Sequence, residues 1–164
     1  MVLASLKVAK IMLLTTIIAV ILLLAVSAVF SGSETALTAV SRGRMHQLEK
    51  DGSRSAACVN RLIENRERLI GSVLLGNTFI NILASSLMTA ALEDRLGHRA
   101  VAITTGIMTV VILIFAEVMP KTLAIARTDR FALLVARPLR LVVSVLAPVV
   151  ASVQWLVWRF LSPF

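Results

Sequence analysis

The stretch Ile112–Thr122, ILIFAEVMPKT, closes a long apolar run and places one carboxylate, Glu117, three residues before Pro120. A charged side chain at the centre of a membrane helix costs ~3 kcal/mol or more, so it normally faces a protein interior or a water-filled path. Pro120 has no backbone N–H, so the carbonyl of Ala116, four residues earlier, loses its helical partner. The stretch therefore predicts an anionic side chain beside a freed carbonyl oxygen, and both are ligands for hard cations.

A structural interpretation of the same residues is also available. Pro120 would kink a helix near its cytoplasmic end, and Glu117 would form an i,i+4 ion pair with Lys121. Because ionisable side chains inside a membrane usually mark a functional path, we favour the ion-binding interpretation. In that interpretation Pro120 is the candidate hinge of a site that changes conformation.

Composition predicts an all-α membrane protein. Of the 164 residues, 58% are hydrophobic, and the mean hydropathy is +0.90. A helix rises about 1.5 Å per residue, so roughly 20 apolar residues cross the hydrocarbon core of a bilayer. We expect three transmembrane helices, at about residues 11–34, 69–92 and 100–120.

The positions of the basic residues predict the orientation of the spans. Ten lysines and arginines lie in segments 41–68 and 121–130, against four in the N-terminal segment and residues 93–99. Basic loops stay in the cytoplasm, so we expect a multi-pass protein of the inner (plasma) membrane with an external N-terminus and a cytoplasmic C-terminus. The net charge of +8 is explained by this topology, and we expect no nucleic-acid partner.

Two segments outside the spans are predicted to be juxtamembrane. Residues 41–66 suggest two short amphipathic helices that lie against the membrane. Residues 131–162 suggest further short helices in the interface, because Pro138 and Pro148 each interrupt the apolar run. A fourth span over residues 139–158 is the alternative, since that segment reaches the lower length limit for a membrane helix.

Oxygen-bearing side chains repeat along two of the predicted spans. Ser27 and Ser31 are four residues apart and share a helix face, as do Asn77 and Asn81. Hydroxyl and amide oxygens suit Mg²⁺ or Na⁺, but serines and amides also join membrane helices by packing and hydrogen bonding. Both interpretations stay open for these four residues.

Gly32 and Glu34 lie close to the serine face. A glycine within a helix costs ~1 kcal/mol relative to alanine, which makes sense where another backbone or an ion comes close. Together with the Ala116 carbonyl and Glu117, the polar faces of the three spans would form an all-oxygen metal site. His46, His98 and Cys58 lie outside the predicted spans, which disfavours zinc or copper.

Three motifs, FSGSETALTAVSRGRM, LLGNTFINI and EVMPKT, resemble in their order and separations the transmembrane domain of the CorC/CNNM family of magnesium transporters. The resemblance covers about residues 11–130. It implies three spans, a belt of cytoplasmic juxtamembrane helices, a homodimer, and Mg²⁺ export driven by Na⁺ entry. The ion-site pattern of the family falls on Ser27, Ser31, Asn77 and Glu117, and extends to Asn81 and Glu34.

Members of this family usually continue into paired cytoplasmic CBS modules that bind ATP with Mg²⁺. The present sequence ends at Phe164 without such modules, so we expect nucleotide regulation to lie outside this chain. One alternative function is a membrane anchor and sensor for CBS domains, without transport of its own. A passive Mg²⁺ channel is another.

We do not expect an enzyme. An intramembrane hydrolase using Ser31 or Ser33 is disfavoured, because the sequence contains neither H-E-x-x-H nor G-x-S-x-G and places no histidine in a predicted span.

Overall fold

A computed structural model of the 164-residue chain describes residues 2–161, with the side chains of residues 10–160. No strand occurs within those described residues. Three continuous helical stretches are long and apolar enough to cross a membrane, namely Lys10–Ala39, Arg66–Ala126 and Thr128–Phe160. The prediction of an all-α membrane protein is therefore confirmed.

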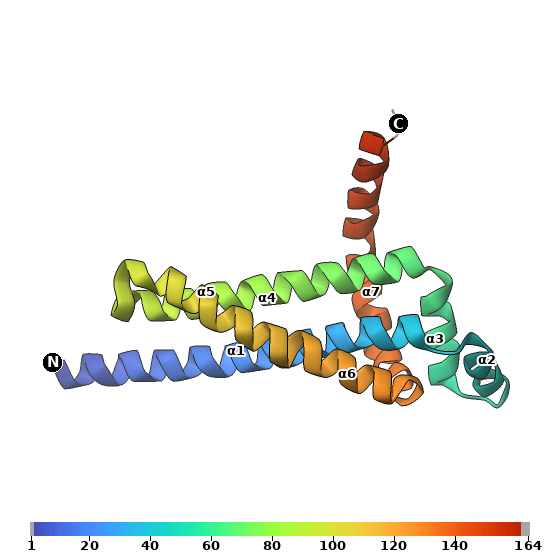
Figure 1. The fold of residues 1–164 in the computed structure, drawn as a ribbon, viewed down its shortest axis with the longest axis horizontal. Helices are drawn as coiled ribbons and strands as arrows, with labels where there is room; N and C mark the ends of the chain where they lie inside the picture. Colours follow the sequence, from blue (N-terminus) through green and yellow to red (C-terminus); the bar gives the residue numbers. More distant parts are fainter. Residues whose placement is uncertain (1, 162–164) are drawn as a thin grey trace.

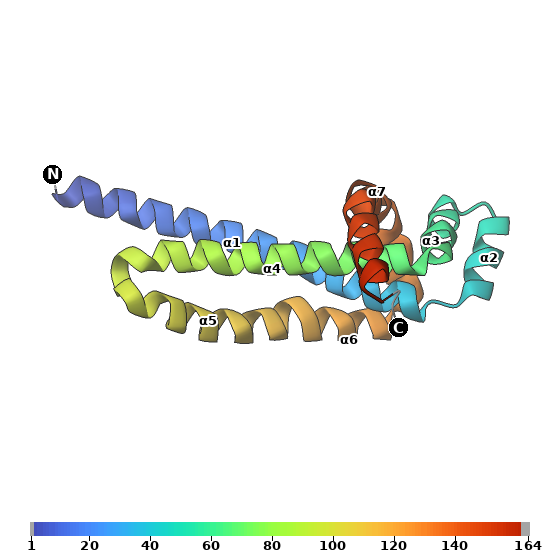
Figure 2. The same cartoon turned by 90° about the horizontal axis from the view of Figure 1, so that it is seen from above.

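The bundle consists of three arms, of which the second runs antiparallel to the first and the third (Figure 1). The first arm is α1 (Val2–Ala39) and the second is α4 (Arg66–Leu96). The third arm comprises α5 (Ala100–Val111), the π-helix η2 (Ile112–Val118) and α6 (Met119–Ala126). The second and third arms join through the short helix η1 (Gly97–Arg99), where Gly97 has φ of +55°, a backbone conformation that favours glycine. The stretch Arg66–Ala126 thus folds back on itself and supplies two arms, as Figure 2 shows.

Two short helices follow the first arm at one end of the bundle. These are α2 (Arg42–Lys50) and α3 (Arg54–Glu64), and the turn between them contains Gly52 at φ of +90°. The Ser53 hydroxyl accepts a hydrogen bond from the Ala56 N–H at 3.3 Å and so caps α3. The last helix, α7 (Thr128–Leu161), packs against α3, and the thiol of Cys58 donates to the Ala136 carbonyl at 3.2 Å.

The prediction of short, broken helices near the C-terminus is wrong. Residues Thr128–Leu161 form one helix, α7, with Pro138 and Pro148 inside it. An internal proline costs ~3 kcal/mol, whereas each fully buried aliphatic side chain contributes ~1.5–3 kcal/mol. The buried apolar residues of α7 are Ala132, Val135, Ala136, Leu139, Val143, Ala147 and Val150. Their packing against the bundle outweighs the two interruptions.

The direction of α7 distinguishes it from the three arms. It lies crosswise to them near the end of the bundle that carries α2 and α3, as Figures 1 and 2 show from two sides. By length and composition α7 also qualifies as a candidate span. Where the three arms cross the membrane together, a helix in this crosswise orientation lies along the membrane surface as a juxtamembrane element.

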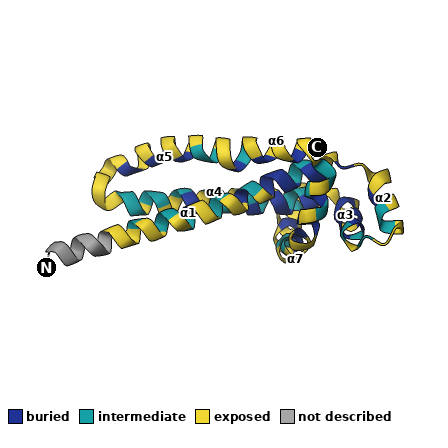
Figure 3. Ribbon diagram, turned by 90° about the horizontal axis from the view of Figure 1, so that it is seen from below, coloured by how far each residue is buried: buried dark blue, intermediate teal, exposed yellow. Residues whose placement is uncertain are grey.

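Burial is uneven along the bundle. In Figure 3 the buried residues gather where α1, α3, α4 and α7 meet, whereas α5 is mostly exposed. The other end has a smaller core of Val20, Ala84 and Met108. Large apolar side chains point outward along the arms, including Phe79 at 64% and Phe115 at 53% exposure. An apolar surface this extensive is expected of a protein whose arms face lipid.

Gly32 lies where α1 meets the third arm and α7, and the space there admits no side chain. A Cβ atom at this position would lie 2.6 Å from Cζ of Phe131 and 3.3 Å from the backbone oxygen of Pro120. The absence of a side chain therefore brings the Pro120 carbonyl close to α1. The contact agrees with the expectation that another backbone segment comes close to α1 at Gly32.

We expect Gly32→Ala to destabilise the protein by ~1–3 kcal/mol, because the added methyl group overpacks this contact. The measurement is thermal unfolding in detergent followed by helicity. Gly106→Ala is the matched control, since nothing lies within 4 Å of a Cβ at Gly106, and it should be neutral or stabilising. Phe131→Leu should recover part of the lost stability. Equal melting temperatures for both glycine variants would contradict the close contact.

Candidate ion site

Ser27 is the centre of a cluster of oxygens between the first and second arms. Its side chain is fully buried, and its Oγ lies 2.6 Å from Oδ1 of Asn77 and 2.7 Å from Oδ1 of Asn81. One hydroxyl proton serves one acceptor at a time, so three oxygens with many lone pairs meet around a single hydrogen. Hydroxyl and amide oxygens of three side chains from two arms thus lie within contact of one another, and oxygens of both kinds are ligands that hard cations bind.

The spacing of these oxygens is close to that of ligands around Mg²⁺. With Mg–O distances of 2.0–2.1 Å, two ligands at right angles lie roughly 2.9 Å apart. The distances from Ser27 to Asn77 and Asn81 are slightly shorter than this value. Both amides are half-buried, and their distances from the Ser27 Oγ are also those of ordinary O–H···O hydrogen bonds.

A π-helix occupies the segment that carries Glu117. Residues Ile112–Val118 form η2, and the Met119 N–H bonds to the carbonyl of Ile114, five residues earlier. Such widened turns are rare and are frequent at functional sites. Pro120 follows in the first turn of α6, and its missing N–H would have bonded the Ala116 carbonyl in an α-helical register. The predicted kink is thus replaced by a widened helical segment in which Ala116 is buried and Glu117 half-buried.

Ser31 links the first arm to this π-helix. Its side chain is fully buried, and its hydroxyl donates a long hydrogen bond, 3.5 Å, to the backbone carbonyl of Glu117. Ser31 lies one turn after Ser27, about 6 Å along the helix axis. The structure thus forms two neighbouring sets of oxygens on α1, one shared with α4 and one shared with η2.

The remaining predicted residues lie around these two sets. Gly32 is buried against Pro120, and Glu34 is half-buried about 10 Å beyond Ser27 along α1. Among the described residues, no hydrogen bond joins the carboxylate of Glu34 to either set, and Glu117 forms no ion pair with Lys121. The i,i+4 pair of the structural interpretation is therefore not formed here.

Two further buried hydroxyls lie within the arms. Ser72 on α4 and Thr104 on α5 are at most 1% exposed, and neither hydroxyl has a hydrogen-bond partner among the described residues. Sequence reasoning did not select either as a site residue. No sequence signal distinguishes them, because serine and threonine are common in membrane helices and only the packing of the arms decides which become buried.

The site lies within a recognisable domain. Residues 17–163 match the family model described as the cyclin M transmembrane N-terminal domain. The match covers the larger part of α1, the second and third arms, and the helices α2, α3 and α7.

Curated relatives of this chain occur in several bacteria. The chain is 46% identical over 107 residues to the UPF0053 inner membrane protein YfjD of Escherichia coli, covering 65% of this chain and 25% of that protein. It is 36% identical over 116 residues to a UPF0053 protein of Haemophilus influenzae, covering 71% and 28%. A UPF0053 protein of Synechocystis is 29% identical over 151 residues, covering 92% and 42%. The matched part of the chain thus corresponds to between 25% and 42% of the length of these three relatives.

Proposed function

The chain belongs to the family of cyclin M transmembrane N-terminal domains, and we propose that it exports Mg²⁺ across the membrane, driven by Na⁺ influx. Its three apolar arms and its family agree with a role in membrane ion transport. The observation that carries the proposal is the cluster in which Ser27 meets Asn77 and Asn81. One helical turn further along α1, the Ser31 hydroxyl donates to the backbone carbonyl of Glu117, and the half-buried side chain of Glu117 is the carboxylate that we assign to the site.

The chemistry of these residues suits an ion that must be both bound and released. Mg²⁺ prefers six oxygens and loses its water reluctantly, so it usually binds through one or two carboxylates with several waters retained. In the proposed mechanism Glu117 supplies the attraction, and the neutral oxygens of Ser27 and Asn77 replace part of the hydration shell. A site with one formal charge holds the ion weakly enough to let it leave.

Transport also requires an element with two conformations, and the π-helix is the candidate. The hydrogen bond from Ser31 to the Glu117 carbonyl is long, at 3.5 Å, and therefore weak. A shift of η2 along α1 would lose little hydrogen-bond energy at this contact. Na⁺ competing for Glu117, or bound near Glu34, would favour one conformation and Mg²⁺ the other. Coupling follows only if the two ions prefer different conformations.

Pro120→Ala tests this role of the third arm. The substitution restores a backbone N–H and favours a regular α-helix over the widened segment. We expect Mg²⁺ affinity to stay within about twofold of wild type while the transport rate falls at least about tenfold, equivalent to ~1.4 kcal/mol. Calorimetry gives the affinity and liposome flux gives the rate. Wild-type flux in the variant would remove the hinge from the mechanism.

The distribution of basic residues also bears on the membrane orientation of the protein. We place the protein in the inner (plasma) membrane, with the N-terminus outside and the end of the bundle that carries α2, α3 and α7 in the cytoplasm. That end carries most of the basic residues, as cytoplasmic segments do. We also propose a homodimer, and in a longer protein CBS modules that bind Mg-ATP. No catalytic activity is part of the proposal.

Flux measurements on the chain in liposomes test the function. With the membrane voltage clamped, we expect Mg²⁺ movement that speeds up when an opposing Na⁺ gradient is imposed. Mg²⁺ flux that ignores the Na⁺ gradient would identify a passive channel. A folded protein without any Mg²⁺ flux would favour the anchor and sensor function.

A further inference from the structure

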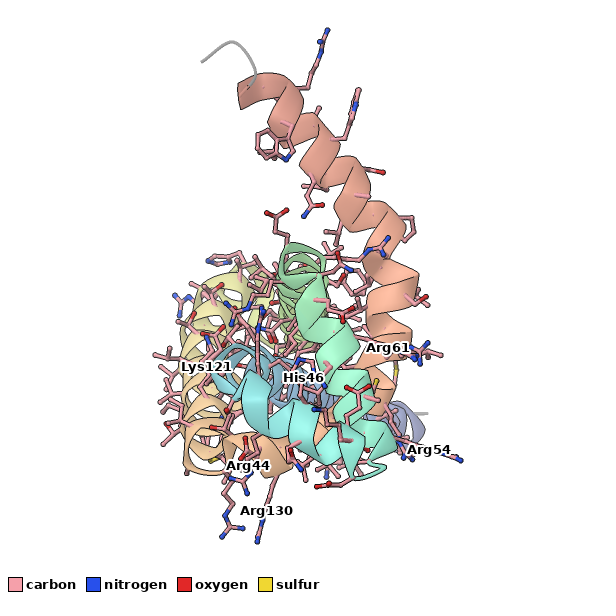
Figure 4. All side chains as sticks on the ribbon, turned by 90° about the vertical axis from the view of Figure 1, so that its right-hand side faces the viewer. Arg44, His46, Arg54, Arg61, Lys121 and Arg130 are labelled. Carbon is pink, nitrogen blue, oxygen red and sulfur yellow. The ribbon has the colours of Figure 1, made fainter. Side chains whose placement is uncertain are left out.

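Five arginines surround two neighbouring cavities where α3, the start of α4 and α7 meet. The first cavity, about 250 Å³, is lined by Arg61, Arg68 and Arg140 together with Leu62, Asn65, Val143 and Ser144. The second, about 280 Å³, is lined by Arg54, Cys58, Arg137 and Arg140. Arg140 lies between the two cavities and belongs to both. Figure 4 shows Arg54 and Arg61 on the side of α3 that adjoins α7.

These arginines have no carboxylate partner inside the cavities. Neither cavity has an aspartate or glutamate in its lining, and none of the five arginines forms an ion pair among the described residues. Arg44 of α2, by contrast, pairs with Asp129 at 2.8 Å. Guanidinium groups bind phosphate through paired hydrogen bonds, and several around one cavity make a strong anion site.

The thiol of Cys58 gives a second indication that these charges converge. Burial raises the pKa of Cys58, and the positive charges of Arg140, Arg61 and Arg137 oppose that rise. Residues from α3 and α7 therefore act electrostatically on one point between the two helices. The hydrogen bond from Cys58 to the Ala136 carbonyl fixes the distance between these helices.

Apolar residues of α3 and α7 adjoin the arginines. Leu62 and Val143 belong to the lining of the first cavity, and along α7 the nearby Leu141 and Val145 are 71% and 67% exposed. Where the three arms cross the membrane, the crosswise helix α7 lies along its surface, at the level where headgroups meet acyl chains. A ligand that fits has an anionic phosphate head and an apolar tail.

We propose that the five arginines hold the phosphate headgroup of an anionic phospholipid, with its acyl chains lying along α7. This assignment is independent of the transport mechanism, because none of the five arginines belongs to the ion site. Both Arg61 and Arg140 are exposed, so substituting them leaves the packing of α3 on α7 in place.

The test is lipid retention, measured by native mass spectrometry on the purified chain titrated with phosphatidylglycerol or phosphatidylcholine. We expect Arg61→Gln with Arg140→Gln to weaken phosphatidylglycerol binding at least about tenfold. The matched control is Arg42→Gln with Lys50→Gln, which removes the same charge from α2 outside both cavities and should change binding less than about twofold. Helicity should be unchanged in both variants.

A second variant separates paired hydrogen bonding from charge. Arg61→Lys with Arg140→Lys keeps the charge but loses the planar fork, and should give an intermediate loss. Equal losses in the cavity and control variants would overturn the site in favour of diffuse attraction. Equally tight binding of phosphatidylcholine would also overturn it. Inorganic phosphate or an acidic peptide binding as tightly as phosphatidylglycerol would reassign the arginines to a soluble anion or a protein partner and refute the lipid.

Discussion

Glu117→Gln is expected to abolish Mg²⁺ flux by the chain in liposomes, with a rate at least about thirtyfold below wild type. The substitution keeps the size of the side chain and removes the formal charge that we assign to the proposed site. A hydrogen bond or ligand contact to a charged group is worth ~1.5–3 kcal/mol, and its loss lowers occupancy accordingly. The flux is followed with a Mg²⁺-sensitive dye.

The matched control for this variant is Glu93→Gln. Glu93 is an exposed carboxylate near the far end of α4, so the change in charge is the same but occurs outside the site. We expect wild-type flux in the control. Equal flux in Glu117→Gln and wild type would show that the carboxylate in the π-helix has no part in transport.

Ser27→Ala is expected to weaken Mg²⁺ binding at least about tenfold and to destabilise the pairing of α1 with α4. The hydroxyl of Ser27 is the shared partner of Asn77 and Asn81. Its single proton satisfies one of the two half-buried amide oxygens at a time, and the loss of that hydrogen bond costs ~0.5–1.5 kcal/mol. Calorimetry measures the affinity, and thermal unfolding measures the stability.

Ser33→Ala provides the comparison, because Ser33 is equally buried on the same helix. Its hydroxyl bonds to the Val29 carbonyl of its own helix, outside the oxygen cluster. We expect Ser33→Ala to change Mg²⁺ affinity by less than about twofold. If both serine variants lost affinity to the same extent, the effect would come from general loosening of α1.

The sequence could predict which residues share a face but not how the faces meet. Spacings of four residues placed Ser27 with Ser31 and Asn77 with Asn81 on single helix faces. Whether one hydroxyl contacts both amides depends on the axial position of α1 against α4. That position is set by packing, such as Phe30 against the flat surface left by Gly76.

Two local features were beyond sequence reasoning. A proline predicts a break in the hydrogen bonding of an α-helix, but the neighbouring packing decides whether the helix kinks, ends or widens. Before Pro120 the helix widens into the π-helix Ile112–Val118. Pro138 and Pro148 predicted breaks in the same way, yet α7 continues through both. The deciding energy there comes from burial against α3 and α4, segments far away in the sequence.

The central claim is that one carboxylate and neutral oxygens inside the membrane bind Mg²⁺ and respond to Na⁺. Calorimetric titration of Mg²⁺ into the purified protein, wild type beside Glu117→Gln and each with and without Na⁺, tests this most directly. We predict binding by the wild type that Na⁺ weakens, and no binding by the variant. Equal Mg²⁺ affinity in the two proteins would contradict the claim and leave Glu117 with a structural role in the third arm.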